Sequence, residues 1–329
     1  MKRLIVCVVL VVLLAACDPM APQPTPFPVI VTSDATPTPE PSPTNTPMPT
    51  PTLTATPTEA IAPTATVAPC INDGGELLEF TQFRSEVANE NLRYNVYVPP
   101  CYAESLSRYP VVYLIHGLSY REQQWQEIGV IDALEQGIRL GALPPMILVM
   151  PYFGTIGQLN QFPPSASYES VILEELAPVI EQDFCTWNNR DYRAIAGISR
   201  GGFWAYSIAM RHPDVFGIAA GHSAVFPEDL RDVPAAFNPI DIADNSTLLP
   251  ESELRMYLDN AAGDLAASSQ RALSDNLRAR SIAHTYIINP VGGHDNDYWG
   301  AHVGEYLAFY GRNWTRDYGA LPSCAEPSP

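Results

Sequence analysis

The sequence predicts an α/β fold, in which a mostly parallel β-sheet lies between two layers of helices. Continuous β-branched runs at 111–115 and 146–150 have the composition of strands covered on both faces, and a further strand is expected at 192–198. Segments with helical periodicity separate these runs, and such alternation is typical of parallel sheets. Of the 329 residues, 46% are hydrophobic and 16% are charged, a balance that excludes a globally disordered protein.

The other elements follow from the same kind of pattern. Apolar and polar residues alternate from Leu92 to Val98, which predicts a half-buried strand before the continuous runs. Pro178 should kink the first of the predicted helices. Two later strands are expected at 255–258 and 284–288, and helices at 167–184, 203–211 and 266–280.

The first 17 residues have the composition of an export signal. Lys2 and Arg3 precede an apolar run over 4–16, which is long enough for a secretory signal and too short to span a bilayer. The run ends in Leu-Ala-Ala-Cys at Cys17, which resembles the lipobox of bacterial lipoproteins. That resemblance implies a lipid on Cys17 and an exported, envelope-anchored chain. An ordinary cleaved signal is the alternative.

Residues 18–69 differ in composition from the rest of the chain. They contain 15 of the 33 prolines, largely in Thr-Pro repeats, and almost no aromatic residues. Such a segment buries too little apolar area to offset its chain entropy. We therefore expect a disordered stalk over 18–69 and a folded catalytic domain over 70–329.

The charge excludes a large class of partners. The chain has 18 basic and 36 acidic residues, and its net charge of −18 would repel a nucleic-acid backbone. Lys2 is the only lysine, which excludes a lysine-containing P-loop and a Schiff-base lysine in the processed chain. We expect no cofactor.

Six cysteines bear on the compartment. Cys7 lies in the signal and Cys17 in the lipobox, which leaves four in the folded domain. An even number of cysteines in an exported domain predicts disulfides, and no pair has the spacing of a zinc knuckle or a thioredoxin-like motif. Spacing alone allows three pairings of these four. They are Cys70, Cys101, Cys185 and Cys324.

The strongest chemical signal surrounds Ser199. The sequence Gly-Ile-Ser-Arg-Gly-Gly occupies 197–202, between the strand at 192–198 and the helix at 203–211. In that context Gly-x-Ser-x-Gly is a nucleophile elbow, a sharp turn that exposes the serine hydroxyl and needs small neighbours. Ser199 is therefore the predicted catalytic nucleophile.

A serine nucleophile needs a base, and the base needs a carboxylate to orient it. In chains with this elbow both follow the serine, with the carboxylate first. His294 lies in a glycine loop just after a predicted strand, whereas His284 begins that strand and His302 lies in the last helix. His294 is the predicted base.

Two aspartates compete for the role of the carboxylate. Asp259 lies at the end of a strand, whereas Asp264 lies in the following loop, from which its side chain can turn toward His294. The sequence favours Asp264, although capping the next helix would also suit that position. No metal site is expected, because the neighbours at 295–297 cannot converge with His294 on one ion.

The tetrahedral intermediate of acyl transfer needs two backbone N–H donors. The Arg200 amide, directly after the nucleophile, is the first. Leu118 is expected to supply the second, because Gly117 allows a tight turn after the strand at 111–115. His116, which ends that strand, is expected to be structural.

Four aromatic residues are candidates for a substrate pocket. Trp125 follows the oxyanion loop and Trp299 follows His294, so these two are predicted to contact the substrate. Packing in the core is the alternative for each of them, and equally for Trp204 and Tyr298.

Over residues 77–312 the chain resembles the putative-esterase family of α/β-hydrolases, which includes feruloyl esterases, S-formylglutathione hydrolases, enterochelin esterases and antigen 85 mycolyltransferases. The resemblance implies an α/β-hydrolase fold, a Ser199–Asp264–His294 triad and an oxyanion hole at Leu118 and Arg200. Arg200 departs from the family, in which many members carry methionine. The matching motifs are Tyr-Val-Pro-Pro at 97–100, Tyr-Leu-Ile-His-Gly at 113–117, the elbow at 197–202, Arg-His-Pro at 211–213, Ala-Gly-Asp at 262–264 and Gly-His at 293–294.

The resemblance also bears on the disulfides. In the family the strand before Cys101 runs antiparallel to the others, so Cys101 should lie at the face opposite the active site, as Cys185 should. Cys70 and Cys324 bracket the domain, and chain ends often lie close together. We therefore expect Cys101–Cys185 and Cys70–Cys324 bonds, with a Cys70–Cys101 bond as the alternative.

Three functions remain open at this point. The first is an exported, lipid-anchored serine ester hydrolase acting on small-molecule or polysaccharide-linked acyl or feruloyl esters. The second is an acyltransferase similar to antigen 85, in which a sugar hydroxyl replaces water. The third is a non-catalytic binding lipoprotein, which would have no need of a nucleophile elbow. The sequence therefore favours the hydrolase.

Overall fold

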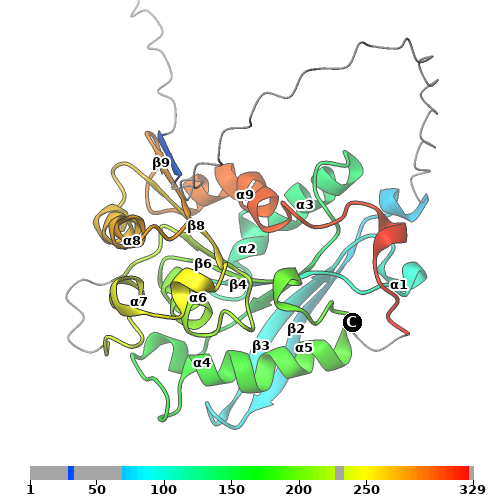
Figure 1. The fold of residues 1–329 in the computed structure, drawn as a ribbon. Helices are drawn as coiled ribbons and strands as arrows, with labels where there is room; N and C mark the ends of the chain where they lie inside the picture. Colours follow the sequence, from blue (N-terminus) through cyan, green and yellow to red (C-terminus); the bar gives the residue numbers. More distant parts are fainter. Residues whose placement is uncertain (1–28, 33–68, 227–232, 326–329) are drawn as a thin grey trace, which may run out of the picture.

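A computed structural model describes residues 29–32, 69–226 and 233–325. Within these residues a nine-stranded sheet forms the centre, and helices cover both of its faces (Figure 1). The strands are β1 (Val29–Thr32), β2 (Glu76–Ser85), β3 (Glu90–Val98), β4 (Val111–Ile115), β5 (Ile147–Pro151), β6 (Arg193–Ile198), β7 (Ile218–His222), β8 (Arg255–Ala261) and β9 (Thr285–Asn289). Their order across the sheet is β1-β9-β8-β7-β6-β4-β5-β3-β2.

The sheet is mostly parallel, as the sequence predicts. Strands β4 to β9 all run parallel to their neighbours among themselves. The antiparallel pairs are β3 with β5, β2 with β3, and β1 with β9. The carboxyl ends of the parallel strands therefore meet at one edge, where active sites of α/β folds form.

The sheet divides the core into two layers, and helices cover each layer. The cluster on one face contains side chains of α5, α6, α7 and α8, and the cluster on the other contains those of α2, α3 and α9. The helices are α1 (Tyr102–Ser105), α2 (Gln124–Glu127), α3 (Val130–Arg139), α4 (Tyr168–Ser170), α5 (Ala177–Asp183), α6 (Arg200–Arg211), α7 (Pro239–Asn245), α8 (Ala267–Ala279) and α9 (Asn296–Tyr310). Short 3-10 turns lie at Pro69–Asn72, Ile156–Gln158, Arg190–Tyr192, Leu249–Glu251 and Tyr318–Ala320.

Strand β4 shows why a continuous β-branched run predicts a buried strand. Val111 and Tyr113 pack into the cluster of the α6 face, whereas Val112 and Leu114 pack into that of the α9 face. All of them are buried, so neither side of the strand needs a polar residue.

Pro178 follows an irregular segment of its predicted helix, and the predicted kink stays a prediction. The segment Val171–Leu176, between α4 and α5, is a π-helix, and Pro178 follows as the second residue of α5. Proline removes one donor and its ring crowds the carbonyl four residues earlier. The wider π turn before the proline accommodates that crowding.

Strand β1 lies inside the segment that was expected to be a disordered stalk. Val29–Thr32 pairs antiparallel with β9 at the edge of the sheet, with Val29 opposite Ile288 (Figure 1). Thr-Pro repeats flank this short apolar run, so the strand was not recognised in the sequence. The domain boundary near residue 70 stays a prediction, and the signal at 1–17 with Cys17 lies outside the described residues.

The predicted disulfide pairing is wrong. The structure joins Cys70 to Cys101 and Cys185 to Cys324, with Cα separations of 5.2 and 5.6 Å. The first bond follows from the β2–β3 hairpin, which the sequence analysis missed: Glu76 at the start of β2 lies opposite Val98 at the end of β3.

The second bond follows from the path of the C-terminal segment. Ser323 forms a β-bridge with Ser107, and the Cys324 amide donates to the carbonyl of Leu106 at 2.7 Å. The Cys185 carbonyl accepts from the Tyr109 amide. Cys185 and Cys324 therefore both lie against the segment 106–109, where they meet. Within the described residues, no helix combines the length and apolarity needed to cross a bilayer.

Candidate active site

Ser199 lies at the tip of a strained turn between β6 and α6. Its backbone has φ 53° and ψ −115°, a conformation that L residues rarely adopt. The Ser199 amide donates to the carbonyl of His222 on β7 at 3.0 Å, which holds the turn against the neighbouring strand. The hydroxyl is thus presented above the carboxyl end of the sheet, as an elbow requires.

Two glycines of the motif are required by close approach. A Cβ on Gly197 would lie 2.2 Å from the carbonyl carbon of Gly201. A Cβ on Gly201 would lie 2.4 Å from the carbonyl oxygen of Ile115 on β4. Any side chain at either position would separate α6 from the sheet, so the spacing of the motif has a steric cause.

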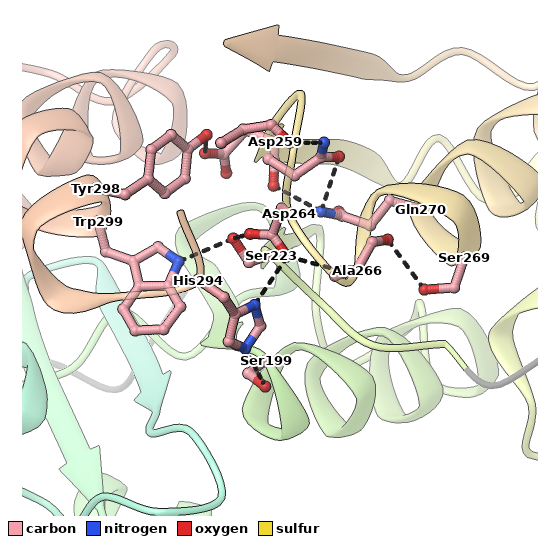
Figure 2. A network of polar contacts seen from close by, with 12 residues as sticks. Ser199, Ser223, Asp259, Asp264, Ala266, Ser269, Gln270, His294, Tyr298 and Trp299 are labelled. Atoms are coloured by element: carbon pink, nitrogen blue, oxygen red, sulfur yellow. Dashed lines mark hydrogen bonds and ion pairs between the residues drawn. The ribbon is translucent and has the colours of Figure 1, made fainter. Parts of the chain in front are cut away.

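His294 connects Ser199 to Asp264. It lies in the loop between β9 and α9, and its Nε2 atom is 2.9 Å from Ser199 Oγ. Its Nδ1 atom is 2.9 Å from Asp264 Oδ1 (Figure 2). Because the carboxylate can only accept, the Nδ1 proton faces Asp264 and the Nε2 lone pair faces the serine hydroxyl.

Asp264 has a fully buried side chain in the loop between β8 and α8. Its Oδ1 atom also accepts from the Ala266 amide at 2.7 Å, and its Oδ2 atom accepts from the Ser223 hydroxyl at 2.6 Å. Burial raises the pKa of this carboxyl, but the hydrogen bonds from His294, Ser223 and Ala266 outweigh burial and lower it below its usual range. The side chain therefore holds the start of α8 and the histidine together.

Asp259, the competing carboxylate, has other partners. Its Oδ1 atom is 2.7 Å from His222 Nδ1, and its Oδ2 atom accepts from Tyr298 at 2.7 Å and from Tyr306 at 2.8 Å. It is fully buried inside β8 and makes no contact with His294. The geometry supports Asp264 as the carboxylate that orients the base.

The loop after β4 is held by two side chains. His116 is buried, its Nδ1 atom is 2.7 Å from the Gly117 carbonyl, and its Nε2 atom accepts from the Phe153 amide at 3.2 Å. Burial lowers the pKa of His116 to about 4, so the ring is neutral at pH 7 and can make both contacts. The Gly117 amide donates to Gln124 Oε1 at 2.7 Å, and Gln124 in turn donates to Asn296 on α9 at 3.0 Å.

The two predicted oxyanion donors remain available. The Leu118 amide has no protein acceptor within the described part of the chain, and Leu118 is exposed. The Arg200 amide is the first N–H of α6, which helix geometry leaves without an intrahelical acceptor.

The Arg200 side chain holds a neighbouring loop. Its guanidinium donates to the carbonyls of Gly157 at 3.2 Å and Leu159 at 2.9 Å. The same group stacks over the rings of Phe203 and Trp204. Burial lowers the pKa of Arg200 to about 10, which leaves it charged at neutral pH. The cation therefore fixes the loop after β5.

The predicted substrate contacts of Trp125 and Trp299 are wrong. Their exposed fractions are 0% and 1%, so neither ring offers surface to a ligand. Trp125 donates to the Ile115 carbonyl at 3.2 Å, and Trp299 donates to Ser223 Oγ at 3.0 Å. Trp204 and Tyr298 are also buried. The rings are close in sequence to the predicted catalytic motifs, but they pack in the core.

Sequence reasoning missed two polar residues next to the site. Ser223, just after β7, and Gln124, in α2, belong to no motif, and each binds a residue far away in the chain, Asp264 and Asn296 respectively. Among the described residues no cluster of His, Cys, Asp or Glu has the arrangement of a metal site. Asp295 instead caps α9 by accepting from the Tyr298 amide at 2.9 Å.

Comparisons with known proteins agree with this geometry. Residues 85–310 match the family described as "Putative esterase". An endo-1,4-beta-xylanase/feruloyl esterase of Xylanibacter ruminicola is 33% identical over 235 residues, which are 66% of this chain and 30% of the relative. An esterase of Mycobacterium tuberculosis is 34% identical over 165 residues, which are 49% of this chain and 34% of the relative. The matches span about a third of the length of these curated relatives.

Solved structures share the fold. A ferulic acid esterase superposes with a TM-score of 0.65 at 24% identity, covering 72% of this chain and 97% of the other. An S-formylglutathione hydrolase of Agrobacterium tumefaciens superposes with a TM-score of 0.62 at 16% identity, covering 74% and 96%. At such identities the likeness establishes the α/β-hydrolase fold. Since the family match covers most of the chain, this protein belongs to the "Putative esterase" family of α/β-hydrolases.

Proposed function

We propose that the chain is a serine carboxylic ester hydrolase that works through an acyl-enzyme on Ser199. One observation carries the proposal: the hydrogen-bonded chain from Ser199 through His294 to Asp264, with both contacts at 2.9 Å. The strained serine backbone and the family match point to the same chemistry. The second hydroxyl–histidine–carboxylate chain among the described residues, which ends at Asp259, is fully buried and cannot meet a substrate.

The proposal gives a role to each group. His294 Nε2 accepts the Ser199 proton as Oγ attacks the ester carbonyl, and Asp264 stabilises the imidazolium that forms. The developing oxyanion accepts hydrogen bonds from the Leu118 and Arg200 amides. His294 then protonates the leaving alcohol. In the second half-reaction it activates water, which releases the acid from Ser199.

The substrate class and the location complete the proposal. The named activities of the relatives, feruloyl esterase and ferulic acid esterase, favour acyl or feruloyl esters carried on polysaccharide. The signal and the Cys17 lipobox favour an exported chain anchored to the membrane by lipid. The two disulfides suit an oxidising, extracytoplasmic location.

The test uses the purified full chain and its Ser199→Ala variant. A fluorophosphonate probe should label the wild type and not the variant, and a panel of feruloyl, acetyl and short-chain esters should yield free acid. Addition of a sugar acceptor distinguishes hydrolysis from acyl transfer, since transfer would replace the free acid with a new ester. Equal labelling of both proteins, or no turnover of any ester, would contradict the proposal.

The anchor is tested separately in cells. Replacing Cys17 by serine removes the lipid acceptor, so the protein should move from the membrane fraction to the soluble exported fraction. An unchanged membrane fraction for Cys17→Ser would show that Cys17 is no lipid acceptor, and it would leave the esterase proposal untouched.

A further inference from the structure

We propose that Ser223 and Trp299 are positioning residues of the triad, joined in a directed pair of hydrogen bonds that fixes the Asp264 carboxylate for His294. Trp299 Nε1 is 3.0 Å from Ser223 Oγ, and Ser223 Oγ is 2.6 Å from Asp264 Oδ2 (Figure 2). The inference rests on the proposed function, because it assigns these residues to the same reaction.

The direction of both hydrogen bonds is fixed by chemistry. The indole N–H of Trp299 can only donate, and the Asp264 carboxylate can only accept. The Ser223 hydroxyl has one proton, so its oxygen must accept from Trp299 and its proton must point to Asp264. A rotated hydroxyl would leave Asp264 Oδ2 without its donor in a buried place, which is unfavourable.

The backbone of Ser223 holds that hydroxyl rigidly. Ser223 directly follows β7 with φ 48°, in the left-handed region that non-glycine residues seldom occupy. Its amide donates to the carbonyl of Asp259 on β8 at 2.8 Å. Its side chain is fully buried, so water cannot replace its contact with Asp264. Such a residue, unusual in conformation and next to a triad carboxylate, is a candidate for function.

Trp299 also contacts the ring of His294. Its indole ring lies at a near-perpendicular angle of 81° to the His294 ring, with centroids 5.2 Å apart. Because Trp299 lies on α9 and His294 on the loop before it, one indole contacts the base while its N–H supports the carboxylate through Ser223. Asp264 and His294 are thereby held by the same buried side chain.

The charge of Asp264 depends on the donors around it. Three donors reach its two oxygens: His294 and Ala266 at Oδ1, and Ser223 at Oδ2. On the neighbouring strands β7 and β8, His222 and Asp259 are hydrogen-bonded to each other. Ser223 is thus the sole side-chain donor to Oδ2 in the described structure, and its loss should raise the pKa of the Asp264 carboxyl.

The central variant is Ser223→Ala, measured beside wild type. We expect kcat to fall about tenfold, as is typical for losing a hydrogen bond to a charged group, with KM nearly unchanged. The acid limb of the pH profile should move to higher pH, because the less supported carboxylate takes up a proton more readily. Trp299→Phe keeps a ring against His294 and removes the donor, so it should show the same changes to a smaller extent.

Matched controls separate positioning from simple loss of packing. Ser207→Ala removes another fully buried hydroxyl, which donates to the Phe237 carbonyl at 2.7 Å. Trp314→Phe removes an indole N–H that donates to the Asp191 carbonyl at 2.8 Å, away from Ser199. Both controls should lower the Tm without moving the acid limb. All rates are normalised to the fraction that a fluorophosphonate probe labels, so partial unfolding cannot imitate a loss of kcat.

The double variant gives the sharpest test. In Ser223→Ala the Trp299 N–H has lost its acceptor, so adding Trp299→Phe should cost less than it does in wild type and should raise the Tm of the single variant. Additive effects would contradict a directed pair. If Ser223→Ala keeps the kcat and acid limb of the Ser207→Ala control, the positioning role is wrong. If wild type itself neither reacts with the probe nor hydrolyses esters, the proposed function fails instead.

Discussion

The amide of Ser199 donates to the carbonyl of His222, so the strained turn of the nucleophile is tied to β7 at 3.0 Å. Ser223 directly follows β7, and its hydroxyl donates to the Asp264 carboxylate. One strand end therefore supports both the proposed nucleophile and the carboxylate proposed to orient its base. This arrangement determines which changes should affect turnover and which should affect only stability.

The first prediction concerns Ser199. Ser199→Ala should lower kcat by about 10⁴-fold or more, because the nucleophile is lost while the turn stays intact. Ser199→Gly should be equally inactive but more stable than Ser199→Ala by about 1 kcal/mol, because glycine relieves the strain at φ 53°. Ester turnover and thermal unfolding of the three proteins check this. A Ser199→Gly protein less stable than Ser199→Ala would contradict the strain argument.

The second prediction compares the two aspartates. Asp264→Asn should lower kcat by about 10⁴-fold, because the amide cannot orient His294 as the carboxylate does. Asp259→Asn should instead lower stability by about 2 kcal/mol, because it disturbs the buried contacts with His222, Tyr298 and Tyr306. Its turnover per folded molecule should stay close to wild type. The assignment is reversed if Asp259→Asn proves the inactive protein.

The third prediction concerns pH and His116. Its folded pKa of about 4 lies below that of an unfolded histidine, about 6.5, so the unfolded state binds more protons between these values. The stability due to neutral His116 is complete above pH 6.5 and is lost as the pH falls toward 4, on the order of 3 kcal/mol in total. His116→Gln cannot titrate, so its unfolding free energy should change less between pH 7 and 4.5. An unchanged pH slope would refute this.

The fourth prediction compares the two disulfides. The Cys70–Cys101 bond closes a separation of 31 residues and the Cys185–Cys324 bond one of 139. The chain-entropy model gives about 4 and about 5 kcal/mol of stabilisation, respectively. Paired serine replacements should therefore destabilise more for Cys185 and Cys324, with little effect on kcat at room temperature. Non-reducing peptide mapping checks the pairing itself; a peptide joining Cys101 to Cys185 would overturn it.

The sequence predicted the elements whose signal is local. Strand β4 was found because both of its faces are buried and its residues are β-branched. Strand β7, with the sequence Ile-Ala-Ala-Gly-His, was missed because its small residues lack that signal. Strand β2 was missed because a bulge between Leu78 and Thr81 breaks its alternation. Missing β2 also led to the wrong disulfides, since its hairpin brings Cys70 to Cys101.

The candidate site divides in the same way. Ser199, Asp264 and His294 lie in motifs whose spacing reflects the turns that carry them, so the sequence could predict that these three side chains meet. The roles of Ser223 and Trp299 depend on a contact between residues 76 positions apart, which leaves no local pattern. The predicted pocket role of Trp299 failed because a sequence position near His294 does not show which side of the ring is covered.

Strand β1 changes how far the proposed enzyme can work from its membrane. If the 52 residues at 18–69 all served as an extended tether, the domain would reach about 160 Å from the lipid at Cys17. If Cys17 carries a lipid, the pairing of Val29–Thr32 with β9 would leave the 11 residues at 18–28 as the tether, with a reach of about 35 Å. Under the proposed anchoring, the position of β1 would restrict the enzyme to esters presented close to the membrane surface.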